Sequence, residues 1–297
     1  MVKMVDIYFN ELLHKYTDNE SRPYISVTTV IHKYINPFDT NLHAERVAKR
    51  TGKTKEQVIA EWNLINKQAC EKGSATHELL ENSINDSNNF VKNTGKSNEY
   101  IKMYSISSIM KNHDYGKLDV EKFSQTKLAL KYPKIMNSIN HYSNKGFYIY
   151  AEIAVYDTRC LICGMIDVLL VNWETKEFII LDWKTNNKPL MFKSGYFKKD
   201  ILGYWSHFVQ KDERMKYPFN SMPDCAGSHY TLQLSLYAAL VEQFGLKQLK
   251  LVLCHIYNNK KTSSEEINFY PIEYKKILID KLIRSRINQL KKEKQND

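Results

Sequence analysis

Three β-prone runs in the middle of the chain restrict most strongly what it can fold into. Residues 147–156, 161–171 and 178–185 are rich in Val, Ile, Leu, Phe and Tyr. Short polar segments join them, and connections of that length suit neighbouring antiparallel strands. The sequence therefore predicts an antiparallel meander at the centre of the fold.

The second and third runs bring two acids together. When Val171 is paired with Phe178, Asp167 lies directly opposite Asp182 on the same face of the sheet. Like charges that oppose each other across strands are destabilising, and the flanking apolar residues increase the cost. A stable chain needs a raised carboxyl pKa, a positive side chain or a bound cation at this point.

Lys184 offers one form of compensation, because it follows Asp182 by two residues and shares its face. One interpretation is a structural Asp-Lys-Asp charge cluster at the rim of the sheet. The other is a site for a divalent cation, since converging carboxylate oxygens suit Mg²⁺ or Mn²⁺. In that case Lys184 is expected to hold or activate a water beside the metal.

The remaining patterns predict an α/β fold, a mixed central sheet flanked by helices. A helical stripe runs from Thr54 to Ile84, with Gly73 as a local break or a point of close packing. The whole chain, 1–297, is predicted to form a single domain. Its core lies at about 54–84 and 147–257, with helical insertions at about 85–146 and 186–222. A strand-and-loop region at 1–50, in which Tyr24 to Val30 is β-prone, precedes the core, and a basic C-terminal helix at 273–294 follows it.

The charge balance favours polyanionic partners. Lys and Arg number 43 against 33 Asp and Glu, a net charge of +10, and the last 23 residues carry +5 of it. Such a surface attracts nucleic acid first and acidic membranes second. For the C-terminal segment alone, a solvated helix remains the alternative. No apolar run approaches the roughly 18 residues of a membrane span, so no membrane role is expected.

Five elements, taken in order, resemble the RecB-like branch of the PD-(D/E)xK nuclease superfamily, which includes mitochondrial genome-maintenance exonuclease and phage exonucleases. The matching segments are Gly73-Ser74-Ala75-Thr76-His77-Glu78-Leu79-Leu80-Glu81, Tyr150-Ala151-Glu152, Gly164-Met165-Ile166-Asp167, Ile179-Ile180-Leu181-Asp182-Trp183-Lys184-Thr185, and Gln233-Leu234-Ser235-Leu236-Tyr237. They span over half the chain. The resemblance implies a restriction-endonuclease-like core and a Mg²⁺- or Mn²⁺-dependent deoxyribonuclease with one or two ions.

The resemblance also implies roles for individual residues. Asp167, Asp182, Lys184 and Gln233 are expected to be catalytic. The expected metal ligands are His77, Asp167, Asp182 and the backbone carbonyl of Trp183, with Glu81 and Glu152 as supporting acids in a second layer. Taken alone, His77 also suits a satisfied interfacial histidine, Gln233 with Tyr237 suits a buried core pair, and Glu152 suits a simple strand charge.

Candidate DNA contacts lie in three places. Tyr237 belongs to the Q-x-x-x-Y element, and Ser26 and Thr28 belong to an S-V-T-T element of related exonucleases. Residues 185–222 carry seven Lys or Arg, three acids and eight aromatic residues, a mixture typical of single-strand binding, although a small helical subdomain uses the same aromatics. Lys193, Lys198 and Lys199 are the basic candidates of this insertion.

The resulting functional prediction is an exonuclease that acts on single-stranded DNA ends or flaps in replication, recombination or repair. A structure-specific endonuclease and a non-catalytic nucleic-acid-binding module remain as alternatives. Cys160 and Cys163 form a lone Cys-x-x-Cys pair, and only Cys254 follows the Q-x-x-x-Y element, so no iron–sulfur cluster is expected. The N-terminus shows neither signal nor transit peptide, which predicts a cytoplasmic protein, with the mitochondrial matrix as the alternative. Frequent Asn, Ile and Lys suggest an AT-rich genome. If that genome is viral, the cytoplasm is that of the host cell.

Overall fold

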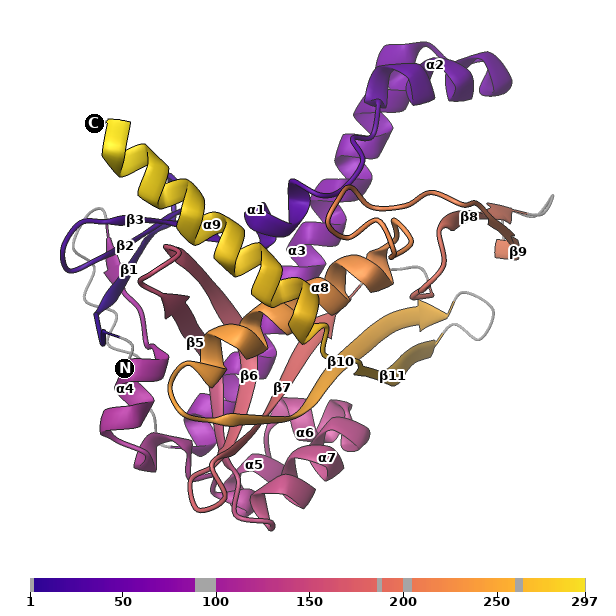
Figure 1. The fold of residues 1–297 in the computed structure, drawn as a ribbon. Coiled ribbons are helices and arrows are strands. Elements are labelled where there is room, and N and C mark those ends of the chain that lie inside the picture. Colours follow the sequence, from indigo (N-terminus) through magenta and orange to yellow (C-terminus); the bar gives the residue numbers. More distant parts are fainter. Residues whose placement is uncertain (1–2, 89–99, 186–188, 200–204, 260–263, 297) are drawn as a thin grey trace.

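A mixed β-sheet with helices on both faces forms the body of the computed structural model (Figure 1). The structure describes residues 3–88, 100–185, 189–199, 205–259 and 264–296. The nine strands of the main sheet follow the order β11-β10-β7-β6-β3-β2-β1-β4, with β5 paired to β6. The predicted α/β class with a mixed sheet is confirmed.

The central meander is the best-predicted part of the fold. It consists of β5 (Tyr148–Asp157), β6 (Ile162–Asn172) and β7 (Glu177–Lys184), and both connections are antiparallel. Val171 pairs with Phe178, and Leu169 pairs with Ile180. The predicted register is therefore confirmed as far as Val168 and Leu181, and it follows from apolar residues that fill both faces of the strands. The predicted pair of Asp167 with Asp182 lies beyond the end of this ladder.

A βαβ crossover extends the sheet beyond β7. Helix α8 (Ala226–Glu242) leads to β10 (Lys247–Asn259), which runs parallel to β7, and β11 (Ser264–Ile272) pairs antiparallel to β10. Most of α8 is buried, in keeping with its apolar residues on all sides. Gly245, at φ +80°, allows the turn after the helix, as the sequence predicts.

The site region begins where β6 changes partner. Its second half pairs with β7 up to Val168, and its first residues, Ile162 and Cys163, pair in parallel with β3 (Pro23–Ser26). Between these pairings β7 and β6 part from one another, one residue before Asp167 would meet Asp182. The divergence leaves room for side chains to meet at the end of the meander.

The N-terminal region contains more helix than the sequence predicts. The region begins with strands β1 (Ile7–Asn10), β2 (Lys15–Asp18) and β3, and the short β4 (Ile101–Lys102) pairs with β1. Helices α1 (Val27–His32) and α2 (Thr40–Thr51) follow β3 along the chain. The prediction of a β-prone run through Val30 is therefore wrong after Ser26. The Ser26 hydroxyl accepts a hydrogen bond from the Thr29 amide and caps α1, a local bond that overrides β-propensity.

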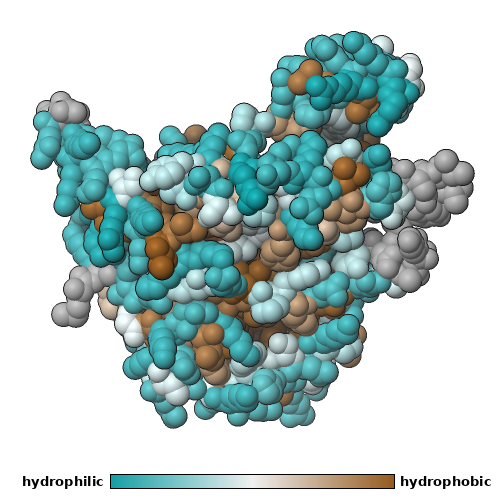
Figure 2. Space-filling view, turned by 45° about the vertical axis from the view of Figure 1, so that its right-hand side comes forward, coloured by the Kyte–Doolittle hydropathy of each residue, from teal (hydrophilic) through white to brown (hydrophobic). Residues whose placement is uncertain are grey.

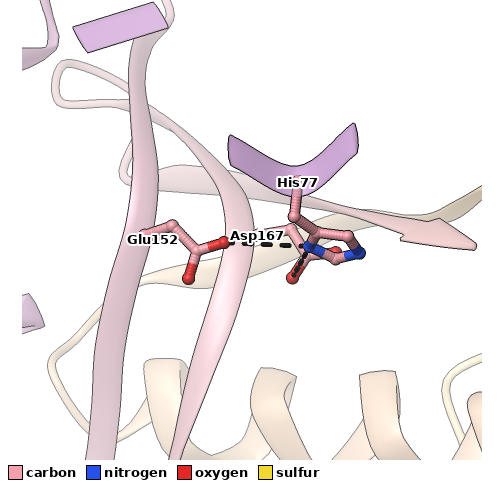
Figure 3. Close-up of side chains that lie close together, drawn as sticks. All are labelled: His77, Glu152 and Asp167. Atoms are coloured by element: carbon pink, nitrogen blue, oxygen red, sulfur yellow. Dashed lines mark ion pairs between the residues drawn. The ribbon is translucent and has the colours of Figure 1, made fainter. Parts of the chain in front are cut away.

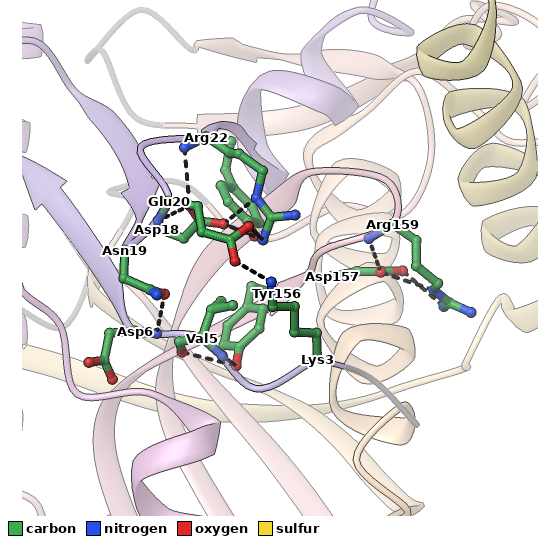
Figure 4. A network of polar contacts seen from close by, with 11 residues as sticks. Lys3, Val5, Asp6, Asp18, Asn19, Glu20, Arg22, Tyr156, Asp157 and Arg159 are labelled. Atoms are coloured by element: carbon green, nitrogen blue, oxygen red, sulfur yellow. Dashed lines mark hydrogen bonds and ion pairs between the residues drawn. The ribbon is translucent and has the colours of Figure 1, made fainter. Parts of the chain in front are cut away.

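Polar contacts hold this N-terminal hairpin in place (Figure 4). The buried Asp18 carboxylate accepts hydrogen bonds from the side chains of Arg22 and Tyr24 and from two backbone amides. The Tyr156 hydroxyl of β5 contacts both the amide and the carbonyl of Val5. Because its partners satisfy the Asp18 charge, the turn can be buried against the core.

Helix α3 (Lys55–Ser87) leaves the body of the protein at its N-terminal half. It pairs there with α2, and this helix pair projects from the sheet (Figures 1 and 2). Val58, Leu80 and Ile84 are buried, but Ile65 is 60% exposed, so the predicted stripe is not buried along its whole length. Gly73 does not break the helix: a Cβ there would lie 3.3 Å from Thr185 Oγ1, which indicates close packing.

The two insertions differ from each other in structure. Between residues 100 and 146 the described segment contains short helices, as predicted: α4 (Ile106–Lys111), η1 (Asp114–Gly116), α5 (Val120–Ser124), α6 (Lys127–Lys131) and α7 (Pro133–Ser143). The described part of 186–222 instead holds a hairpin of β8 (Gly195–Lys199) and β9 (Trp205–Gln210) and irregular chain. The prediction of a helical insertion is wrong there, because the aromatic residues of the two strands, such as Tyr196, Phe197 and Phe208, favour extended chain.

The helices divide between the two sheet faces. α1, α8 and the basic C-terminal helix α9 (Lys276–Asn296) cover one face, and the second half of α3 with α5, α6 and α7 covers the other. The end of β7 is thus accessible from helices of both layers. This arrangement decides which side chains can reach Asp167 and Asp182.

Gly164 of β6 allows Tyr237 of α8 and Val27 of α1 to pack closely against the strand. A Cβ at this position would lie 2.6 Å from Tyr237 Cε1 and 2.9 Å from Val27 Cγ2. We expect Gly164→Ala to lower the free energy of unfolding by about 1–3 kcal/mol, because the ring of Tyr237 has to move. Urea unfolding checks this, with Gly73→Ala as the control that meets a single atom at 3.3 Å. Equal stability of Gly164→Ala and the wild type would contradict the packing described.

Candidate metal centre

Three side chains from three different elements meet at the end of the meander (Figure 3). His77 comes from α3, Glu152 from β5 and Asp167 from β6, and one donor atom of each lies within 4.8 Å of the other two. His77 Nδ1 lies 3.6 Å from Asp167 Oδ1 and 3.9 Å from Glu152 Oε1. The three groups are partly buried and converge on a small volume.

The backbone of β5 is distorted where it contributes Glu152. The flanking pairs, Ala151 with Val168 and Ile153 with Ile166, place Glu152 opposite Asp167. Glu152 itself has φ +51°, a left-handed conformation that is uncommon for a residue with a side chain. Such a distortion is often found at functional sites, where the surrounding structure stabilises it.

Asp182 and Lys184 of β7 form the second part of the site. Lys184 Nζ lies 2.5 Å from Asp182 Oδ2, and the Lys184 side chain is only 16% exposed. The same ammonium group lies 4.7 Å from the centre of the Tyr230 ring. The backbone amide of Trp183, between Asp182 and Lys184 in the chain, donates a hydrogen bond of 2.7 Å to Asp167 Oδ2. This bond ties the end of β7 to β6 after the strands have parted.

Helix α8 lies on the opposite face of the sheet from α3 and adds the side-chain amide of Gln233. Gln233 Nε2 lies 3.5 Å from Asp182 Oδ1 and 3.2 Å from the Tyr237 hydroxyl. Both residues share one side of the helix because they are four positions apart. Tyr237 is buried, so in this structure it supports Gln233 rather than presenting its ring to a ligand. The DNA contact that the resemblance assigns to Tyr237 does not fit this burial.

Burial and mutual repulsion shift the titration of the acids. Burial, assisted by the Asp167 charge and opposed by Lys184, raises the pKa of Asp182 to about 6. Burial likewise raises the pKa of Asp167, although His77 and Lys184 act in the opposite direction. Both carboxyl groups are therefore harder to ionise here than in water, and a bound divalent cation would favour their ionised forms.

The pKa values of the two basic groups are raised as well, against the effect of burial. Burial lowers the pKa of His77, but the hydrogen bond to Glu152 and the charge of Asp167 outweigh it and raise the pKa overall. Burial also acts to lower the pKa of Lys184, but Asp182 and Asp167 raise it above the usual value. Lys184 therefore stays an ammonium beside the carboxylates.

The structure changes the role expected for one acid. Glu152, predicted as a second-layer acid, is one of the three side chains whose donor atoms meet. Glu81, the other predicted second-layer acid, lies one turn along α3 from His77, and its Oε1 is 3.5 Å from Asn85 Nδ2. Sequence reasoning underrated Glu152 because a regular strand alternation did not reveal the left-handed residue at this position.

Three of the other predicted site residues lie near the centre, whereas the lysines predicted from the 186–222 insertion lie elsewhere. Lys184 and Gln233 each contact Asp182, whereas the metal contact of the Trp183 carbonyl stays a prediction. Ser26 is occupied as the cap of α1, and Thr28 lies beside it. Lys193 and Lys198 are exposed near the β8–β9 hairpin, and the side chain of Lys199 lies outside the described residues. Their DNA contacts stay predictions.

The donor set fits a small divalent cation. Two carboxylates and one imidazole face one another within 4.8 Å, and hard oxygen donors suit Mg²⁺ or Mn²⁺. Asp182, next to Asp167, is a fourth candidate donor on the neighbouring strand. The cysteines offer no comparable set: Cys160 and Cys163 are buried free thiols whose pKa values burial raises.

Comparisons with known proteins add little to this geometry. No family model and no curated protein matches the chain. Among solved structures, the crystal structure of SSO0001 is similar over 73% of this chain and 87% of that one, at 16% sequence identity and a TM-score of 0.24. That likeness is too weak to carry an argument about fold or activity.

None of the described helices combines the length with the apolar character that crossing a bilayer needs.

Proposed function

We propose that this chain is a metal-dependent nuclease that hydrolyses phosphodiester bonds in DNA. One observation carries the proposal: the carboxylate–imidazole cluster of His77, Glu152 and Asp167 lies beside the Asp182–Lys184 pair. A structural charge cluster needs only as many acids as its lysine can neutralise. Here three carboxylates surround one lysine and one histidine, an excess that favours a cation site.

The PD-(D/E)xK resemblance supports the same reading. The Asp167 strand, the Asp182-Trp183-Lys184 strand and the Gln233–Tyr237 helix side meet at one point, as that resemblance requires. The meander, the α8 crossover and the parallel strand β10 are compatible with a restriction-endonuclease-like core, which we include in the proposal.

Each side chain has a chemical task in this proposal. His77, Glu152 and Asp167, with Asp182 as a further donor, would hold the cation. When bound, a divalent cation neutralises the charge that develops on the phosphate and assists the leaving oxygen. Lys184, kept charged by Asp182, would orient and polarise the attacking water, and Gln233 would fix the position of the Asp182 carboxylate.

The net charge of +10 and the basic end of α9 support a nucleic-acid substrate. We further propose single-stranded DNA with a free end. The test is a digestion of end-labelled linear, circular, single-stranded and double-stranded DNA with Mg²⁺ and with EDTA. The proposal expects Mg²⁺-dependent release of nucleotides from linear single strands. Cutting of circles would indicate an endonuclease instead, and binding without any cleavage would indicate a non-catalytic module.

The raised pKa values predict how metal binding depends on pH. A buried Asp182 with a pKa of about 6 favours its neutral form, so the metal-free fold loses stability as pH rises from 3.8 through about 6. A metal needs the ionised carboxylates and the neutral imidazole of His77. We therefore expect Mg²⁺ to raise the melting temperature more at about pH 8 than at about pH 5.

Differential scanning fluorimetry with and without Mg²⁺ measures this difference. Mg²⁺ effects of equal size at both pH values, or no effect at either, would count against carboxylate ligation at this site.

A further inference from the structure

A small pocket lies between α1 and α8, which are side by side in Figure 1. We call it the α1–α8 pocket. Its volume is about 180 Å³, and its lining residues are Thr28, Ile31, His32, Ala226, His229, Tyr230 and Gln233. Two imidazoles, two hydroxyls and an amide belong to these lining residues and are groups that can donate hydrogen bonds, and none of the lining residues carries a carboxylate. Such a lining favours an anionic ligand.

His229 is held firmly in the wall of this pocket. Its Nε2 lies 2.6 Å from Asp224 Oδ1. The other oxygen of Asp224 accepts hydrogen bonds from the backbone amide and the side-chain amide of Asn36, at 2.8 and 2.7 Å. Because Nε2 is engaged, Nδ1 is the ring nitrogen left for a ligand. When Nδ1 carries a proton, it can donate a hydrogen bond to a ligand in the pocket while Nε2 stays with Asp224.

The pocket is joined to the candidate metal centre through two residues. Gln233 lines the pocket and also contacts Asp182, and Tyr230 lines the pocket while its ring lies 4.7 Å from Lys184 Nζ. A ligand in the pocket is therefore a near neighbour of a group bound at the carboxylates. The volume is too small for a drug-sized ligand, which usually needs about 300 Å³ or more, but suits a phosphate with part of its sugar.

We propose that the α1–α8 pocket binds a backbone phosphate of single-stranded DNA, adjacent to the phosphate at the metal centre, and that His229 donates to it. This inference rests on the proposed nuclease function for its choice of polyanion. His229 is then a substrate-positioning residue, and Asp224 and Asn36 fix its ring. The arrangement selects a strand whose neighbouring phosphate can enter a narrow pocket, and a single strand can bend to do so.

A binding experiment tests the contact itself. Short single-stranded oligonucleotides carry one neutral methylphosphonate at each position in turn. Fluorescence anisotropy in EDTA measures their affinity for Asp182→Asn protein, which we expect to leave them intact during the measurement. We expect one position at which the neutral linkage weakens binding about ten-fold, the size of a charge-assisted hydrogen bond. With His229→Gln added, the same linkage should change binding less than about two-fold.

The controls separate this contact from a structural role. His141→Gln makes the same change at an exposed histidine of α7, and it should leave the ten-fold effect intact. If His229→Gln does not fold, His32→Gln in the same pocket takes its place. An identical phosphate profile with and without His229, or no sensitive position at all, would overturn the inference. Failure of the wild type to cleave any DNA would instead remove the proposed function, while the binding scan would still decide the pocket.

Discussion

Asp182→Asn is expected to lower the rate of DNA cleavage severely while the protein still folds and binds DNA. The substitution removes a buried carboxylate that orients Lys184 and lies next to Asp167. We expect kcat to fall on the order of 10³-fold, the size typical for loss of one electrostatic group in an active site. Asparagine preserves the shape of the side chain and its contact with Gln233, so folding should survive.

The comparison for this variant is Asp212→Asn, which makes the same change at an aspartate whose side chain is 85% exposed. Time courses on a labelled single strand, with melting curves for both proteins, give the result. A folded Asp182→Asn protein that cleaves at the wild-type rate would contradict the catalytic role of Asp182.

Glu152→Gln is expected to raise the Mg²⁺ concentration needed for half-maximal cleavage by about 10²-fold. Its carboxylate is one of three donor groups that meet, and the left-handed backbone at this residue directs it toward the other two. Glutamine removes the charge and keeps the size. Because the other donors remain, a high Mg²⁺ concentration should recover part of the activity.

A matched change is Glu174→Gln, at an exposed glutamate in the β6–β7 turn. Its Mg²⁺ titration should overlay that of the wild type. If Glu152→Gln overlays it as well, Glu152 is a supporting strand charge and not a metal donor.

Local rules sufficed for the centre of the fold. The register of β6 and β7 follows from apolar residues on both faces and a short connection, so the proximity of Asp167 and Asp182 could be predicted from the sequence. The four-residue spacing of Gln233 and Tyr237 likewise predicts their shared helix side. These features depend on periodicity within one or two elements.

Features that depend on several elements could not be predicted in the same way. The hydroxyl of Ser26 starts a helix in a β-prone run, because a cap and tertiary packing outweigh weak propensities. The position of Glu152 among the donors needs a single left-handed residue, and no sequence pattern encodes that at a glutamate. The α1–α8 pocket combines residues about 200 positions apart.

The most direct test of the metal centre is anomalous diffraction from crystals grown with Mn²⁺. The account predicts a manganese peak coordinated by the His77 ring and by the carboxylates of Glu152 and Asp167, at distances of about 2.0–2.2 Å. A crystal of cleavage-competent protein with no peak at this position, or with its manganese held by other residues, would contradict it.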